Sequence, residues 1–126
     1  MELTRSGRKA AETGYPECAA ETVTDGALRW LRATERPFFL WLHYYDPHAD
    51  YLAPPAYQRP GGHPYDDEIA YVDFELGRVL NDLEKRGLTE RTLVMITSDH
   101  GESLGEHGEP THGLFLYEGV MRVPLI

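Results

Sequence analysis

The strongest constraint on the fold is a long amphipathic helix pattern placed between two short apolar runs. Residues 37–45, PFFLWLHYY, are continuously apolar and aromatic, and residues 92–99, TLVMITSD, are rich in β-branched side chains. Strands that are buried on both faces of a parallel sheet have this composition. The order of strand, loop, helix and strand therefore predicts a βαβ unit with two parallel strands.

The helix between the two runs is predicted over residues 65–87. Its apolar side chains recur at steps of three and four residues and predict one core-facing stripe, made of Ile69, Val72, Leu76, Leu80 and Leu83. Asp66 and Asp67 lie in the first turn and Lys85 and Arg86 in the last, as the helix dipole favours. Gly87 follows as a suitable residue to end the helix.

A shorter helix is predicted upstream, and it runs to about Thr34. Thr22 or Thr24 is the expected N-cap. Its apolar face is predicted to consist of Val23, Ala27, Leu28, Trp30 and Leu31. Residues 46–64 carry five of the nine prolines and are predicted to form a long loop, of the length that is usually functional.

Composition excludes some functions and leaves others open. The chain has 126 residues, enough for one domain or part of one, and its 41% hydrophobic content can form a core. Its net charge of −9 argues against nucleic-acid binding, which needs a basic face. No apolar run approaches the roughly 20 residues that span a membrane, and residues 1–12 lack a signal-peptide core. The compartment therefore stays open.

Polar side chains that could carry chemistry follow both predicted strands. His48 comes after the first strand in Asp-Pro-His, and Asp99 and His100 end the second. Because both strands of a βαβ unit point the same way, these residues are expected at one edge of the sheet, where α/β folds place ligands. Asp99 and His100 suit a divalent cation such as zinc, manganese or iron. The alternative for Asp99 is a cap in a strand-end turn, with Gly101 letting the chain turn away.

Two more histidines, His107 and His112, lie in the glycine-rich stretch 101–113. Either could bind a metal or hydrogen-bond an anionic substrate, and His48 could donate to a sulfate or phosphate oxygen. Plainer roles are favoured elsewhere: a turn for Asp46, core packing for His43, a surface place for His63, and solvated loop charges for Glu102, Glu106 and Glu109. Cys18 is the only cysteine, so no disulfide can form within the chain, and no nucleophile motif surrounds it.

In combination, these motifs resemble the sulfatase family, part of the alkaline phosphatase superfamily. The resemblance is carried by residues 38–57, 65–108 and 111–126, in that order, and covers about residues 20–126. It implies an α/β fold: a fragment of an alkaline-phosphatase-like three-layer sandwich with a mostly parallel sheet. Residues 1–126 would then be one partial catalytic domain, with both chain ends cut. The motif RVPLI at 122–126 reads as the start of a buried strand.

By position, the resemblance implies metal binding by Asp99 and His100 and contact of His48 with the sulfuryl or phosphoryl group. His112 stands where many sulfatases carry a lysine, and could bind substrate oxygen, protonate the leaving group or approach a metal. Many sulfatases have Asn in place of His100 and hold calcium. The His instead resembles phosphonate hydrolase and phosphotransferase branches, which favour manganese, zinc or iron. The expected cofactor is a divalent ion: calcium, manganese or zinc.

The activity implied by the resemblance is metal-dependent hydrolysis of sulfuric esters, with a small-molecule or glycan sulfate or phosphate ester as substrate. Residues 1–21 contain no nucleophile motif of the form C/S-x-P-x-R, so the chain alone is expected to be inactive. Two alternatives stay open. One is a phosphodiesterase, phosphonate monoester hydrolase or phospho-group transferase of the same superfamily. The other is an inactive, truncated metal-binding remnant.

Overall fold

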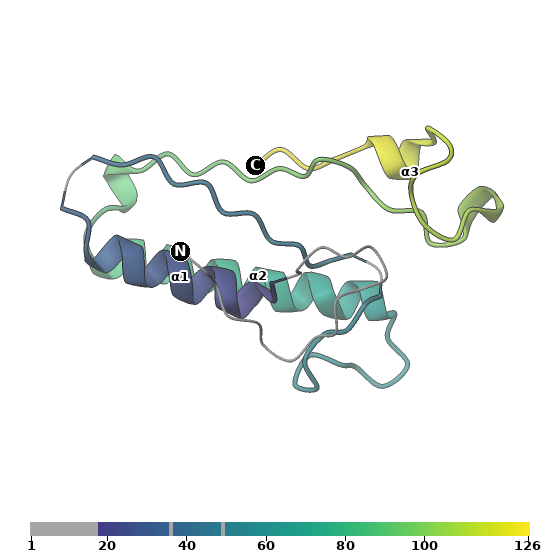
Figure 1. The fold of residues 1–126 in the computed structure, drawn as a ribbon, viewed down its shortest axis with the longest axis horizontal. Coiled ribbons are helices and arrows are strands. Elements are labelled where there is room, and N and C mark those ends of the chain that lie inside the picture. The colour runs from purple at the N-terminus through teal and green to yellow at the C-terminus, as the bar shows by residue number, and fades with distance from the viewer. Residues whose placement is uncertain (1–17, 36, 49) are drawn as a thin grey trace. The chain divides into compact units, whose positions relative to one another are not determined.

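The computed structural model describes residues 18–35, 37–48 and 50–126 (Figure 1). The chain divides into two compact units, Met1–Thr89 and Glu90–Ile126, and each is described by itself. The interpretation of residues 1–126 as one partial catalytic domain stays a prediction. None of the described helices is long and apolar enough to span a membrane.

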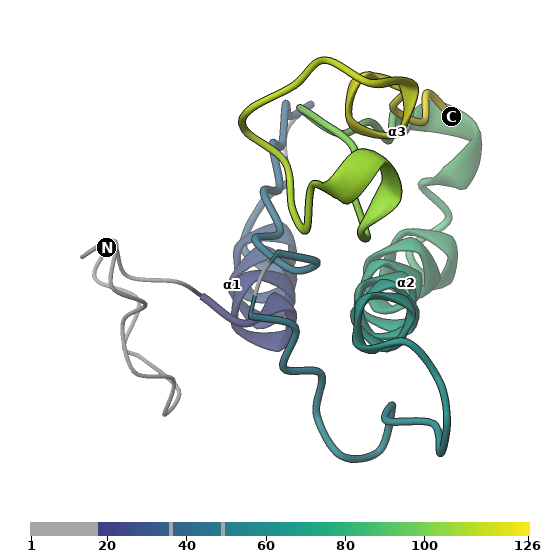
Figure 2. The same cartoon turned by 90° about the vertical axis from the view of Figure 1, so that its right-hand side faces the viewer.

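The first unit is built on two helices that lie side by side, α1 (Ala20–Arg32) and α2 (Pro64–Lys85) (Figure 2). Near their starts the Tyr71 hydroxyl accepts a hydrogen bond from the Glu21 N–H at 2.9 Å. Near their ends the Arg86 guanidinium donates to the Leu31 carbonyl oxygen at 2.8 Å. Because start meets start and end meets end, the two helices run in the same direction.

The start of α1 differs from the prediction. Neither Thr22 nor Thr24 is the N-cap, because the helix already begins at Ala20 and has no side-chain cap from its own flank. The Asp46 carboxylate accepts the Ala20 N–H at 2.9 Å, and the Tyr71 hydroxyl accepts the next one. An anion at a helix N-terminus also interacts favourably with the helix dipole. Prediction of an N-cap from the neighbouring residues cannot detect partners that lie this far away along the chain.

Helix α2 confirms the predicted element and its ends. His63 precedes it, and the His63 Nδ1 accepts the Tyr65 N–H at 3.2 Å. Gly87 follows it with a φ of 65°, the left-handed conformation that glycine adopts at low cost.

The face that α2 buries matches the predicted apolar stripe only in part. Ile69 and Leu80 are 44% and 39% exposed. The buried positions are Asp67, Glu68, Tyr71, Glu75, Val79 and Leu83. Polar side chains can be buried when they find hydrogen-bond partners, and a pattern that counts only apolar residues does not register them. Of the predicted stripe, Leu83 is buried and Val72 and Leu76 are half-buried. The prediction was therefore wrong for Ile69 and Leu80 and missed the polar members of the buried face.

The core of this unit forms around Leu31, Val79 and Leu83. Phe38, Leu40 and Leu42 of the extended segment 37–45 pack against it, whereas the intervening Phe39 and Trp41 are 84% and 76% exposed. The segment thus shows the period of two that is typical of an extended chain with one buried face. Within the described residues it is not buried on both faces, and it joins no strand ladder.

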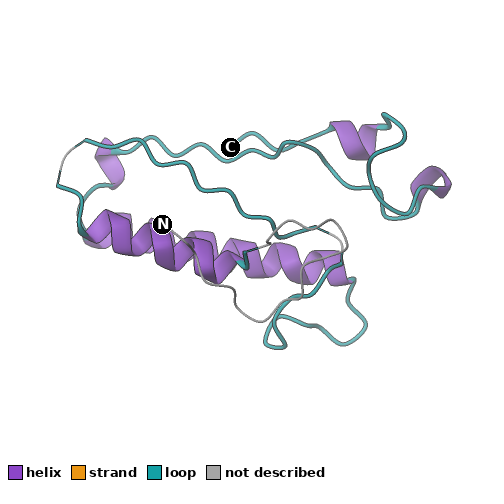
Figure 3. Ribbon diagram, viewed as in Figure 1, coloured by secondary structure: helices purple, strands orange, loops and turns teal. Residues whose placement is uncertain are grey.

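The second unit contains the predicted strand 92–99 as an extended segment, drawn as loop in Figure 3. Its one described pairing is an antiparallel bridge between Thr97 and Leu125. Next to the bridge, Ile96 and Ile126 exchange N–H···O bonds of 2.9 and 3.0 Å. The predicted parallel sheet is therefore not confirmed among the described residues. Leu125 is 73% exposed, so the RVPLI end is not a buried strand here.

A close backbone contact explains Gly101, which ends Asp-His-Gly. Its N–H donates to the Val120 carbonyl oxygen at 2.6 Å, and a Cβ on Gly101 would overlap the Gly119 carbonyl oxygen. The contact joins the loop to the short helix α3 (Glu118–Met121). Two short 3-10 turns, η1 (Thr89–Arg91) and η2 (Glu106–Gly108), complete the described elements.

Truncating two leucines of α2 tests which face is buried. Leu83→Ala is expected to lower the free energy of unfolding by about 2–5 kcal/mol, because Leu83 is 6% exposed and its loss leaves a cavity. Leu80→Ala is the matched control and should cost under about 1 kcal/mol, because Leu80 is partly solvated. Urea titration followed by circular dichroism measures both. Equal losses of unfolding free energy in the two variants would mean that α2 buries the predicted apolar stripe, including Leu80.

Candidate active site

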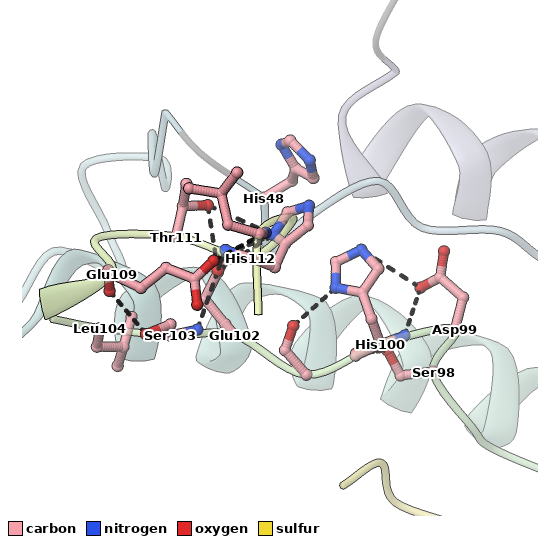
Figure 4. Close-up of polar contacts among 12 residues, drawn as sticks. His48, Ser98, Asp99, His100, Glu102, Ser103, Leu104, Glu109, Thr111 and His112 are labelled. Carbon is pink, nitrogen blue, oxygen red and sulfur yellow. Dashed lines mark hydrogen bonds and ion pairs between the residues drawn. The ribbon is translucent and has the colours of Figure 1, made fainter. Parts of the chain in front are cut away.

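The loop that follows the extended segment 92–99 is organised around Glu102 (Figure 4). The Glu102 side chain is 4% exposed. Its Oε1 accepts hydrogen bonds from the His112 N–H at 2.8 Å and the Thr111 hydroxyl at 3.2 Å, and lies 3.1 Å from the His112 Nδ1. An ionised carboxylate can only accept, so Nδ1 carries the proton and the Nε2 of the neutral ring carries the lone pair.

His112 lies against His100 in the same loop. The two imidazole rings stack with their centroids 4.0 Å apart and their planes at 29°. The His100 Nδ1 lies 2.7 Å from the Gly101 carbonyl oxygen. Because that oxygen only accepts, Nδ1 is the donor here too, and the lone pair of His100 is on Nε2. A backbone carbonyl that fixes the tautomer in this way is a common partner of metal-binding histidines.

Asp99 is the second ligand that the sequence predicts for a cation. Its Oδ1 accepts the His100 N–H at 3.1 Å and lies 3.8 Å from the His100 Nε2. Zinc binds nitrogen and oxygen ligands at about 2.0–2.2 Å each, so one cation can contact both atoms at this separation. The described residues hold no group of three or more His, Cys, Asp or Glu side chains that could bind a metal. Asp99 and His100 could therefore supply two of the ligands in the coordination shell of a cation, but not a complete shell.

Glu109 shapes the backbone that follows His112. It is 3% exposed, and its Oε1 accepts the N–H groups of Leu114 at 2.9 Å and Phe115 at 3.2 Å. The Ser103 hydroxyl donates to the Glu109 carbonyl oxygen at 2.7 Å. Two carboxylates thus hold this stretch of backbone: Glu102 binds it at His112, and Glu109 binds the N–H groups of the residues that follow His112.

The prediction that the loop glutamates are solvated was wrong for Glu102 and Glu109, and it holds for the exposed Glu106. Sequence reasoning missed both buried residues because a glycine-rich, acidic stretch has no periodicity that separates inward from outward side chains. The one usable signal is the density of backbone N–H groups in an irregular loop, since each of them needs an acceptor.

His107 packs locally. Its backbone is left-handed, with a φ of 59°, and its ring stacks on Tyr117 with a centroid distance of 4.0 Å. This contact gives the exposed imidazole a partner within its own loop, and no described contact links it to a cation site.

His48 belongs to the first unit and lies in the loop that leaves the extended segment. Its N–H donates to Glu68 at 3.2 Å, and its ring lies 4.6 Å from that of Tyr45. Asp46, predicted to be a turn residue, is 3% exposed and caps α1 as described above. His43 is exposed, so its predicted core packing was wrong, and His63 is exposed as predicted.

The far end of this loop is tied to α2 by an ion pair. The Arg59 Nε donates to the Asp67 Oδ1 at 2.9 Å, and the Arg59 N–H donates to Oδ2 at 3.2 Å. The hydrogen bond from the guanidinium lowers the pKa of Asp67 below its ordinary value.

Comparison with known proteins assigns the family. The Sulfatase family model matches residues 3–126. The mouse (Mus musculus) steryl-sulfatase is 35% identical over 90% of this chain and 20% of that protein. An N-acetylglucosamine-6-O-sulfatase of Bacteroides thetaiotaomicron is 49% identical over 46% of this chain and 10% of that protein. The chain thus spans about a fifth or less of the length of these relatives.

A solved structure agrees with these matches. The Bacteroides fragilis protein YidJ, assigned as a sulfatase, superposes with a TM-score of 0.76 and 25% identity. The superposition covers 89% of this chain and 31% of YidJ. The chain belongs to the sulfatase family.

Proposed function

We propose that this chain supplies part of the catalytic site of a metal-dependent hydrolase that cleaves sulfate esters. Asp99 and His100 would hold a divalent cation, and His48 and His112 would contact the transferred sulfuryl group. The observation that carries the proposal is the Glu102–His112 pair stacked on His100, directly beside Asp99. Family membership, and relatives named as sulfatases, favour the sulfate ester over other anionic substrates.

His112 would act on the ester through Nε2. Because Glu102 holds Nδ1, the imidazole has one fixed orientation, and Nε2 can accept a proton or, once protonated, donate one to an ester oxygen. The Glu102 carboxylate, 4% exposed, would stabilise the imidazolium that forms. A cation bound by Asp99 and His100 would neutralise charge on the sulfate oxygens.

The proposal names the ester and not the alcohol. The relatives are named for a steryl ester, an N-acetylglucosamine ester and, in the human protein that is 41% identical over 44% of this chain, an iduronate ester. Because these alcohols differ in size and polarity, similarity to all three does not favour one of them. Preference for one alcohol would depend on residues outside the part of the relatives that this chain matches.

Metal binding is expected to raise the thermal unfolding midpoint of the 126-residue chain. Titration with Mn²⁺, Zn²⁺ or Ca²⁺ should shift the midpoint upward, because a cation that binds only the folded state stabilises it by mass action, by about 2.7 kcal/mol at 100 times Kd. Asp99→Asn and His100→Ala should abolish the shift. Asp73→Asn, a change at an exposed carboxylate of α2, should retain it.

Two results would contradict this part of the proposal. One is the absence of any shift at millimolar metal, which would favour an inactive remnant. The other is a full shift in both Asp99→Asn and His100→Ala.

Ester preference is tested with the protein expressed from the longest open reading frame that contains these residues. It should hydrolyse 4-nitrophenyl sulfate faster than 4-nitrophenyl phosphate. His112→Ala should lower kcat about 10²–10³-fold, because a proton donor and an oxygen contact are lost together. His107→Ala is the matched control and should change kcat little, since its ring stacks on Tyr117.

Preference for the phosphate ester would replace the proposal with the phosphohydrolase alternative. An unchanged kcat in His112→Ala would remove His112 from the site.

A further inference from the structure

Glu68 is a fully buried carboxylate on α2 that binds the loop carrying His48. Its relative exposure is 0%, and it is among the largest fully buried side chains of the described residues. Oε1 accepts the Leu52 N–H at 2.7 Å, and Oε2 accepts the His48 N–H at 3.2 Å. One side chain thus uses both of its oxygens to bind the backbone at His48 and at Leu52.

Burial of the Glu68 carboxylate costs free energy, because it removes the group from water, unless hydrogen bonds compensate the loss. The described residues between Asp46 and His63 form no helix or strand, so the N–H groups that make no turn hydrogen bond within the loop need acceptors from elsewhere. Hydrogen bonds from N–H groups to a charged oxygen are shorter and stronger than neutral ones. Glu68 and the loop therefore satisfy each other.

Neighbouring contacts show that the loop is fixed at other points too. Asp46, two residues before His48, is bound to the start of α1. Asp67, beside Glu68 on α2, holds Arg59 further along the loop. Because the loop is tied on both sides, the Glu68 contact sets the local backbone direction at His48 rather than the path of the loop as a whole.

We propose that Glu68 is a positioning residue that fixes the backbone of His48 and, through it, the direction of the His48 imidazole. The functional half of this inference rests on the proposed contact of His48 with the sulfuryl group. The structural half, that Glu68 holds the backbone at His48 and at Leu52, stands independently of it.

The structural half is tested by amide hydrogen exchange in the 126-residue chain. Glu68→Gln replaces one accepting oxygen with an NH₂ group, which must face a backbone donor. Exchange at His48 and Leu52 should accelerate about tenfold or more, with helix amides such as that of Leu31 changing less. Glu68→Asp keeps the charge on a shorter side chain and should give an intermediate acceleration, which provides a result if Glu68→Gln does not fold.

Glu75→Gln is the matched control. Glu75 lies on the same helix, is 3% exposed, and bonds Arg78 at 2.6 Å instead of the loop. It should accelerate exchange generally, without selective loss at His48 and Leu52. Equal patterns in the Glu68 and Glu75 variants would overturn the structural half.

The functional half is tested by a double-mutant cycle on hydrolysis of 4-nitrophenyl sulfate, with the protein from the complete reading frame. Glu68→Gln should lower kcat about 10–100-fold with a smaller change in KM, because a small misplacement of a contacting group slows the reaction. In a His48→Ala background, Glu68→Gln should cost nothing further. Additive losses would overturn the positioning role. Selective exchange without hydrolysis by the unsubstituted protein would overturn the proposed function and leave the loop anchor standing.

Discussion

A buried carboxylate that accepts hydrogen bonds from its own loop is the interaction on which the second unit depends. Glu102 receives the backbone N–H and ring Nδ1 of His112 and the hydroxyl of Thr111. Glu102 makes the shortest described contact to the His112 Nδ1, at 3.1 Å, and that contact places the proton of the ring on Nδ1. The proton-carrying role proposed for His112 follows from this cluster, and the stacked His112 ring links it to His100 of the proposed cation site.

In the first unit, too, buried carboxylates accept hydrogen bonds that hold the backbone. Asp46 receives an N–H of α1, Asp67 receives Arg59, and Glu68 receives two loop N–H groups. These contacts change the meaning of the net charge of −9. Many acidic residues do form a solvated face, but a subset is buried and structural: Asp46, Asp67, Glu68, Glu75 and Glu109. In irregular loops rich in glycine and proline, such carboxylates take the place of the strand and helix partners that the backbone lacks.

Sequence reasoning identified the features that local patterns determine. Helix α2 with its ends and the resemblance to sulfatases were predicted and are confirmed. Residues 37–45 and 92–99 were predicted to be parallel strands, and they are extended segments for which the described residues show no parallel pairing. Sequence reasoning failed where a partner comes from elsewhere in the chain, as for the cap of α1 from Asp46 and the buried polar face of α2. It also failed at Glu102, because an irregular loop has no periodicity that marks an inward side chain. Residues 37–45 were also predicted to be buried on both faces. No described residue covers the face that carries Phe39 and Trp41. The predicted roles of His48, Asp99, His100 and His112 stay predictions.

The most direct test of this account is the tautomer of His112, read from ¹⁵N chemical shifts of the imidazole rings in long-range ¹H–¹⁵N spectra. The chain would be measured with a chelator present, at a pH of about 8, where an ordinary imidazole is neutral. The account predicts a proton on Nδ1 of His112, and its loss to a mixture of tautomers in Glu102→Ala. A proton on Nε2, or a mixture that Glu102→Ala leaves unchanged, would contradict the central claim that Glu102 orients this histidine.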